Sequence, residues 1–216
     1  MTVIILYKTL IVIFSYLLGA FPTAYIIYRV KTGKDIRNEG SGNVGGTNVT
    51  RTVGATLGII TILSDILKGL IPVVLIYFVY PKDLVLLAIV SVAAIVGHDF
   101  PVYLKFKGGK GISTSFGVII GLCILPFAVS VALWIRILPI PAILITWLIA
   151  FAASRIVSLS SLVAAIATPL SFYFSKHPLP VVIASVCFFI LTFIAHRANI
   201  KRLIKREEKK IKSKGA

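Results

Sequence analysis

Apolar residues dominate almost the whole chain and are interrupted only by short polar or glycine-containing breaks. Most of the apolar stretches approach the roughly 20 residues that a helix needs to cross the hydrocarbon of a bilayer. The pattern therefore predicts an all-α fold, a polytopic bundle of seven transmembrane helices, with the shorter spans inside the bundle. The expected spans cover residues 3–28, 53–80, 84–97, 112–133, 138–153, 158–174 and 180–195.

The composition supports a membrane protein. Hydrophobic residues make up 58% of the 216 residues and charged residues only 14%, and the mean hydropathy is +1.00. A soluble globule of this size cannot bury so much apolar surface. We expect one membrane domain over residues 1–204 and a solvated basic tail over 205–216. The first span has no charged segment ahead of it and no small-residue cleavage pattern, so we expect a retained helix and not a removable signal.

Lysine and arginine are segregated by loop. The net charge of +16 could indicate nucleic-acid binding, but 18 of the 23 basic residues lie in segments 29–52, 98–111 and 154–157 and from 196 onward. The positive-inside rule places those segments in the cytoplasm, which puts the N-terminus outside and the C-terminus in the cytoplasm. We therefore expect no nucleic-acid partner, and the sequence identifies no protein partner.

The first polar loop is rich in glycine. In KTGKDIRNEGSGNVGGTNVTR, from 31 to 51, the glycines alternate with Ser41, Asn43, Thr47 and Asn48. Several bare backbone amides can turn toward one anion in such a segment. Residues 40–45 also fit GxGxxG, but no strand pattern precedes them, so we reject a dinucleotide site.

The second loop, GHDFPVYLKFKGGKG from 97 to 111, places lysines among glycines directly before an apolar span. The positive end of the following helix would face this loop. A Walker phosphate loop is excluded, because its required positions hold Gly111 and Leu104. Lys105 and Lys107 by themselves also fit an ordinary charge cluster, whereas Lys110, enclosed by glycines, is the stronger candidate.

Two smaller polar clusters follow. Arg155, Ser158, Ser160 and Ser161 lie at a span boundary, where serines often serve as helix caps and can also bind a phosphate oxygen. The segment HRANIKRL, from 196 to 203, spaces His196 and Asn199 for one face of a helix, if the helix continues.

The remaining polar or reactive residues inside the spans have simple structural explanations. Asp65 and Lys68 are three residues apart, and we expect an internal ion pair because isolated charges are costly in hydrocarbon. Cys123 and Cys187 lie in apolar helix without CxxC spacing or a neighbouring histidine, so we expect core packing. The sequence predicts neither a metal site nor a cofactor.

Taken together and in this order, the four polar segments resemble the bacterial acyl-phosphate-dependent glycerol-3-phosphate acyltransferases, the PlsY family. The segments that match are GSGNVGGTN with Arg51, GHDFPVYLKFKGGKG, the run from Arg155 to Ser161, and His196-x-x-Asn199. The resemblance implies transfer of a long-chain acyl group from acyl phosphate to the sn-1 hydroxyl of glycerol 3-phosphate. The products are lysophosphatidic acid, for phospholipid synthesis, and phosphate. It also implies a seven-helix protein of the bacterial inner membrane with its site facing the cytoplasm.

The resemblance supplies the candidate site residues. The catalytic candidates are Ser41, Lys110 and His196. The substrate-binding candidates are Gly42, Asn43, Gly45, Thr47, Asn48, Arg51, Gly108, Gly109, Gly111, Arg155, Ser158, Ser160, Ser161 and Asn199. Arg51 and Lys110 would neutralise phosphate charge, and His196 with Asn199 would orient the glycerol phosphate.

The HxxxxD pattern of acyl-CoA-dependent acyltransferases is absent, because Tyr103 and Lys201 stand five residues after His98 and His196. An acyl phosphate is already activated, so positioning and charge stabilisation can suffice, and a phosphate oxygen can accept the hydroxyl proton. We therefore favour substrate-assisted catalysis, with His98 and Asp99 as rival acid–base candidates. The alternative is a transporter for phosphate or an organic phosphate, since glycine-broken helices in membranes also bind anions.

Overall fold

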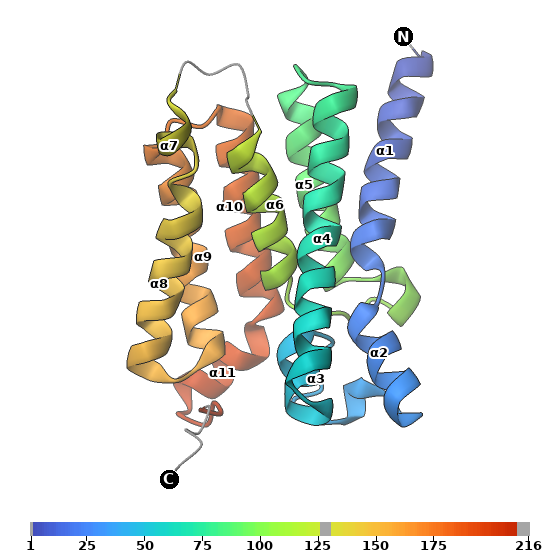
Figure 1. Cartoon of the computed structure of the whole chain (residues 1–216), viewed down its shortest axis with the longest axis vertical. Helices are drawn as coiled ribbons and strands as arrows, with labels where there is room; N and C mark the ends of the chain where they lie inside the picture. The colour runs from blue at the N-terminus through green and yellow to red at the C-terminus, as the bar shows by residue number, and fades with distance from the viewer. Residues whose placement is uncertain (1, 126–130, 211–216) are drawn as a thin grey trace. The chain divides into compact units, whose positions relative to one another are not determined.

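The computed structural model describes residues 2–125 and 131–210, and every regular element in these ranges is helical (Figure 1), which confirms the all-α class. The chain divides into two compact units, unit 1 over Met1–Leu125 and unit 2 over Pro126–Ala216. The predicted site residues fall into both units. The residues from the first two polar loops lie in unit 1, and those from the last two lie in unit 2.

Unit 1 is a bundle of long apolar helices with short helices at one end. Its elements are α1 Thr2–Ala20, α2 Thr23–Thr32, the 3₁₀ turn η1 Ile36–Asn38, α3 Gly46–Val53, α4 Ala55–Val79, α5 Leu84–Asp99, the 3₁₀ turn η2 Val102–Leu104 and α6 Ile112–Ile124. The most extensive helix contacts join α1 to α5, α4 to α6 and α3 to α4. Figure 1 shows α2 and α3 at the end of this unit that is opposite the N-terminus.

Glycines allow the long helices of unit 1 to approach closely. A side-chain carbon on Gly19 of α1 would overlap the backbone of Ala94 in α5, and one on Gly97 would overlap the carbonyl oxygen of Tyr16. Helices α4 and α6 meet in the same way at Gly69. Small residues at such crossings let van der Waals contacts hold helices together in a bilayer, where the hydrophobic effect between helices is absent.

Two helices that the sequence predicts as continuous are broken. The expected span 3–28 is divided into α1 and α2 at Phe21 and Pro22, because proline has no N–H group to continue the helical ladder. The expected start of the second span at residue 53 is also interrupted. Gly54 separates α3 from α4, and its φ of +104° is a backbone conformation that residues with a side chain rarely adopt.

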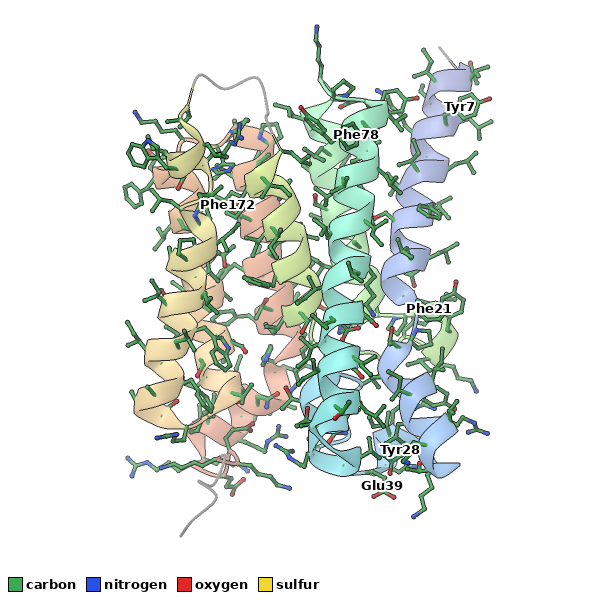
Figure 2. All side chains as sticks on the ribbon, in the orientation of Figure 1. Tyr7, Phe21, Tyr28, Glu39, Phe78 and Phe172 are labelled. Carbon is green, nitrogen blue, oxygen red and sulfur yellow. The ribbon has the colours of Figure 1, made fainter. Side chains whose placement is uncertain are left out.

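A hydrophobic cluster joins the polar loops of unit 1. Its buried members come from α2, η1, the first glycine loop, α3 and η2, and they are Ala24, Tyr28, Ile36, Val44, Val49 and Leu104. Figure 2 shows Tyr28 and Glu39 together at this end of the unit, whereas Tyr7 and Phe78 lie at the opposite end. The cluster brings the loops around residues 36–48 and 97–111 side by side, although they are some 60 residues apart in the sequence.

Unit 2 is a second helical bundle. It contains α7 Leu133–Arg136, α8 Pro139–Ser154, α9 Val157–Phe174, α10 Leu179–Ala195 and α11 Arg197–Ile204. Helix α9 contacts both α8 and α10. The chain bends by 62° between α10 and α11, and α11 lies at the end of the unit opposite α7 (Figure 1).

Five segments of the described chain are long and apolar enough to cross a membrane, and a sixth is obtained if α10 and α11 count as one bent span. Each of the seven expected spans contains an apolar helix, but α6 has only 13 residues. Residues 126–130 of the expected span 112–133 lie outside the described residues. A polytopic helical protein is therefore confirmed, whereas seven crossings, the orientation of the termini and the single domain over 1–204 stay predictions.

Candidate active site

Asn48 organises the first glycine loop. Its side-chain oxygen accepts a hydrogen bond of 2.9 Å from the backbone N–H of Ser41, and its amide nitrogen donates to the carbonyl oxygen of Glu39 at 3.0 Å. The side chain is buried, and Gly40 and Gly42 turn the chain around it with φ of +63° and +71°. The buried side chain of Asn48 thus holds the backbone of the loop in place, and the side chain of Ser41 is exposed.

Helix α3 carries two further candidate residues on an exposed face. Thr47 and Arg51 are four residues apart, so they lie on one side of the helix, and both are exposed. Gly45 precedes the helix and Gly46 begins it, so the first backbone amides of α3 point toward the glycine loop. The helix therefore offers amide donors at its first turn and a cation, Arg51, in its last turn, and both kinds of group can bind an anion.

The second glycine loop closes back on the end of α5. The backbone N–H of Gly109 donates to the carbonyl oxygen of His98 at 3.0 Å, and a side-chain carbon on Gly109 would overlap the imidazole of His98. Gly111, with φ +66°, lies against the carboxylate of Asp99 and directly precedes α6, as the sequence predicts. Lys110 is half-buried between these two contacts.

Arg37 ties the two loops together. It forms an ion pair of 2.6 Å with Asp35, donates to the carbonyl oxygen of Leu104 at 3.4 Å and lies 5.6 Å from the ring centre of Tyr25. The side-chain hydrogen bond from Arg37 holds the pKa of Asp35 below its ordinary value. The structure therefore brings the candidates of the first two loops to one end of unit 1, and it gives Arg37 a structural role.

In unit 2, two candidate residues share one carboxylate. The hydroxyl of Ser158 donates to Oε1 of Glu208 at 3.0 Å, and the side-chain amide of Asn199 donates to the same oxygen at 2.6 Å. Arg202 donates to Oε2 at 2.6 Å. Ser158 and Asn199 are buried, so Glu208 joins the start of α9 to α11.

Sequence reasoning missed Glu208, which it placed in a solvated tail. Partial burial acts to raise the pKa of Glu208, but the hydrogen bonds from Arg202, Asn199 and Ser158 outweigh burial and hold it below its ordinary value. The only sequence signal was an acidic pair within a lysine-rich run, and that pattern usually indicates a solvated segment. The side chain of Glu208 therefore contacts α9 and α11, whereas the boundary of the tail at residue 205 stays a prediction.

The other serines of the third segment bond to their own helix. The hydroxyl of Ser160 donates to the carbonyl oxygen of Ile156, and that of Ser161 donates to Val157, each at 2.9 Å. The indole N–H of Trp147 donates to Ser161 at 3.3 Å. Arg155 ends α8 in a left-handed conformation and is exposed. Ser160 and Ser161 are therefore buried and bonded within the protein, whereas Arg155 presents an exposed charge.

His196 forms the corner between α10 and α11. Its Nδ1 lies 2.8 Å from the carbonyl oxygen of Thr192, so we assign the ring proton to Nδ1 and leave Nε2 as an acceptor. The side chain is buried, and its carbonyl oxygen accepts from the backbone N–H of Ile200. The helix thus bends at His196, yet it keeps Asn199 on the buried side as the spacing predicts.

A buried charged group lies behind the second loop. Lys68 donates to Asp65 at 2.9 Å, which confirms the predicted ion pair, and Nδ1 of His98 lies 3.8 Å from the same carboxylate. Within the ranges that the structure describes, no three His, Cys, Asp or Glu side chains are grouped so that they could hold a metal ion. Cys123 is buried, and neither described cysteine forms a disulfide.

Comparison with known proteins identifies the family. A family model described as glycerol-3-phosphate acyltransferase matches residues 9–206. The chain belongs to this family. A glycerol-3-phosphate acyltransferase of Endomicrobium trichonymphae is 42% identical over 96% of this chain and 97% of its own. One from Thioalkalivibrio sulfidiphilus is 44% identical over 94% of each.

Solved structures agree with this assignment. The chain resembles the crystal structure of PlsY (YgiH), an integral membrane glycerol 3-phosphate acyltransferase, in its glycerol 3-phosphate form. The TM-score is 0.83 and the sequence identity is 33%, and the match covers 95% of this chain and 96% of that one. The lysophosphatidic acid form gives a TM-score of 0.80. The chain is therefore an integral membrane acyltransferase of phospholipid synthesis, and the enzyme hypothesis is favoured over the transporter.

Proposed function

We propose that this acyltransferase uses an acyl phosphate as its donor and acylates the sn-1 hydroxyl of glycerol 3-phosphate. The hydroxyl oxygen forms an ester bond with the acyl carbon, and the bond between that carbon and the phosphate oxygen breaks. A phosphate oxygen takes the hydroxyl proton, so lysophosphatidic acid and inorganic phosphate leave. The observation that carries this proposal is the pair of glycine-rich loops that the hydrophobic cluster holds at one end of unit 1.

That arrangement suits a reaction with two phosphorylated substrates. The loops carry the cations Arg51 and Lys110, and Gly45 and Gly46 place the first backbone amides of α3 next to the first loop. The N–H groups of Gly42 and Gly109 donate within the protein, to Glu39 and His98, and so shape the loops. Amides and cations are the groups that hold phosphate and stabilise charge on a departing phosphate oxygen. The apolar helices around them suit the acyl chain of a lipid-soluble donor.

The placement of the acid–base residues supports substrate-assisted catalysis. His98 and Asp99 are buried, and they lie behind Gly109 and Gly111, on the side that faces α5. A residue packed against the back of the loop is poorly placed to take a proton from a substrate held at its front. An acyl phosphate is itself a strong acyl donor, so positioning and charge stabilisation account for the chemistry.

The roles of the remaining candidates follow from their surroundings. Ser41 and Lys110 would contact the phosphate groups directly. His196 would orient the glycerol phosphate together with Asn199, which has a buried side-chain oxygen with no hydrogen-bond partner among the described residues. We propose that the polar segments face the cytoplasm at the bacterial inner membrane, as the positive-inside rule indicates.

The donor is tested with purified protein. Palmitoyl phosphate and glycerol 3-phosphate are mixed with the enzyme, and inorganic phosphate and lysophosphatidic acid are measured. Palmitoyl-CoA replaces the donor in a parallel reaction. We expect both products with palmitoyl phosphate and no lipid product with palmitoyl-CoA. Equal or faster turnover with palmitoyl-CoA would exclude the proposed donor.

A further inference from the structure

Lys68 connects the middle of α4 to the break between α1 and α2. From the middle of α4, its ammonium group donates to the carbonyl oxygen of Phe21 at 3.0 Å and to Asp65 at 2.9 Å. Phe21 lies between the end of α1 at Ala20 and Pro22, and Figure 2 shows it between the two ends of the unit. The same carbonyl oxygen accepts from the backbone N–H of Thr23 at 3.0 Å, so Lys68 adds a second, charged donor at the helix break.

The same ion pair lies beside the residue that supports the second glycine loop. Nδ1 of His98 is 3.8 Å from Asp65 and has no hydrogen-bond partner among the described residues. The backbone oxygen of His98 accepts from Gly109, and its ring faces Gly109 without room for one more carbon. A shift of the imidazole would therefore move the loop.

The ion pair, His98 and the second glycine loop line a small pocket. Its walls include Phe21, Asp65, Lys68, His98, Gly108 and Gly109. The ion pair forms one side of this pocket and the glycine loop forms another, with the imidazole between them. The second glycine loop therefore packs against His98, and His98 lies next to the ion pair of Lys68 and Asp65. Lys68 in turn bonds to Phe21, at the break between α1 and α2.

We propose that Lys68, Asp65 and His98 are positioning residues for the second glycine loop, and that they set the affinity for the phosphate group of glycerol 3-phosphate. The inference rests on the proposed role of that loop in phosphate binding. The ion pair holds the imidazole, the imidazole holds Gly109, and Gly109 fixes the direction of the amides beside Lys110. None of the three positioning residues needs to touch the substrate.

The alternative is that the ion pair contributes only to folding. Both alternatives predict lower stability when one partner is removed, because an unpaired buried charge is costly. Only the positioning role predicts a selective loss of affinity for the phosphate substrate. Steady-state constants for the two substrates, measured below the unfolding temperature, distinguish the two alternatives.

The test uses Lys68→Gln, which removes the charge and cannot reach as far, and Lys68→Arg, which retains the charge and the donors. We expect Lys68→Gln to raise KM for glycerol 3-phosphate at least tenfold, with KM for palmitoyl phosphate within twofold of the original value. Lys68→Arg should recover most of the affinity. Asp65→Asn, which keeps an acceptor for Lys68, should give a smaller increase and supplies the measurement if Lys68→Gln does not fold.

The matched control is Lys8→Gln. Lys8 forms a 2.6 Å ion pair with Asp83 in the same unit, at the end away from the glycine loops, so both KM values should stay unchanged. A lower unfolding temperature with unchanged KM in Lys68→Gln, or in Asp65→Asn, would overturn the positioning role.

Failure of the proposed function has a different signature. The unmodified protein could show no turnover with palmitoyl phosphate and still be stabilised thermally by glycerol 3-phosphate. In that case the proposed donor is wrong. The positioning role is then tested by the dissociation constant for glycerol 3-phosphate in the same variants. Unchanged binding in those variants would then overturn it. A protein that neither binds nor acylates glycerol 3-phosphate would contradict the proposed function, and the positioning role would be rejected with it.

Discussion

The side-chain amide of Asn199 donates a hydrogen bond of 2.6 Å to Glu208, nine residues further along the chain. Arg202 and Ser158 bind the same carboxylate, so an acidic residue from the predicted tail fixes the buried side of α11. The position of Asn199, a candidate for orienting glycerol phosphate, therefore depends on a residue outside the four polar segments.

Glu208→Gln should lower both stability and activity. The neutral amide weakens three hydrogen bonds to a charged acceptor, and we expect a loss of about 2 kcal/mol in the free energy of unfolding. Because the folded pKa of Glu208 is below its ordinary value, this contribution is present at neutral pH and is lost as the pH falls below about 4.3. Denaturant unfolding in detergent at pH 7 and pH 4 measures the difference. Glu207→Gln, at an exposed position, is the control, and an equal loss there would contradict the assignment.

Gly109→Ala should weaken substrate binding more than it weakens folding. The added methyl group overlaps the ring of His98, so the loop has to move away from α5. We expect KM for glycerol 3-phosphate to rise about tenfold, with a smaller change in kcat, in steady-state assays. Gly33→Ala provides the control, because a side chain there meets nothing within 4 Å and its positive φ of +74° strains only a distant turn. Unchanged KM in Gly109→Ala would show that the loop does not bind this substrate.

Asn48→Ala should disorder the first glycine loop. The substitution leaves the N–H of Ser41 and the carbonyl oxygen of Glu39 without their partner, and each lost buried partner costs about 1–3 kcal/mol. We expect faster proteolysis within residues 38–47 and a large fall in activity. Thr47→Ala, at the neighbouring exposed position, should leave the protease pattern unchanged. Equal protection of the loop in Asn48→Ala would contradict the organising role.

His177 should make unit 2 sensitive to acid. Burial lowers its pKa to about 4, and its ring contacts Phe172 edge-on with a centroid distance of 4.7 Å. The folded state therefore keeps a neutral imidazole, whereas the unfolded chain takes up a proton near pH 6.5. Its contribution to stability is complete above pH 6.5 and is lost as the pH falls toward 4. Thermal unfolding from pH 7.5 to 4 should show a flatter profile for His177→Gln, and an identical profile would refute the assignment.

Much of the fold follows from hydropathy, because backbone groups in hydrocarbon must form helices. The expected spans 84–97, 138–153, 158–174 and 180–195 agree with α5, α8, α9 and α10 to within two residues at each end. The breaks after Ala20 and at Gly54 were not predicted, because apolar residues continue near each break and the hydropathy pattern does not indicate where a helix is interrupted. The short helix α3 also escaped prediction, because its polar composition resembles loop sequence. Helix α11 agrees with the helical spacing of His196 and Asn199.

The candidate site was predictable where several residues of one type cluster in the sequence. Glycines beside lysines indicate a phosphate-binding loop, and the structure gives those glycines close backbone contacts with α5. Contacts between distant segments were not predictable. Asn48 was expected to bind substrate, yet its side chain bonds to backbone groups of its own loop, and Glu208 is 50 residues from Ser158.

Helix α6 has a mechanical consequence for the bilayer. Its 13 residues cover about 20 Å, against about 30 Å for an average hydrocarbon layer. A helix of this length cannot cross such a layer by itself, and the glycines before Ile112 are its polar end. Under the proposed function, a dissolved anion at that end would meet the acyl donor at the depth of the lipid chains, so the fatty chain would not have to be lifted out of the lipid.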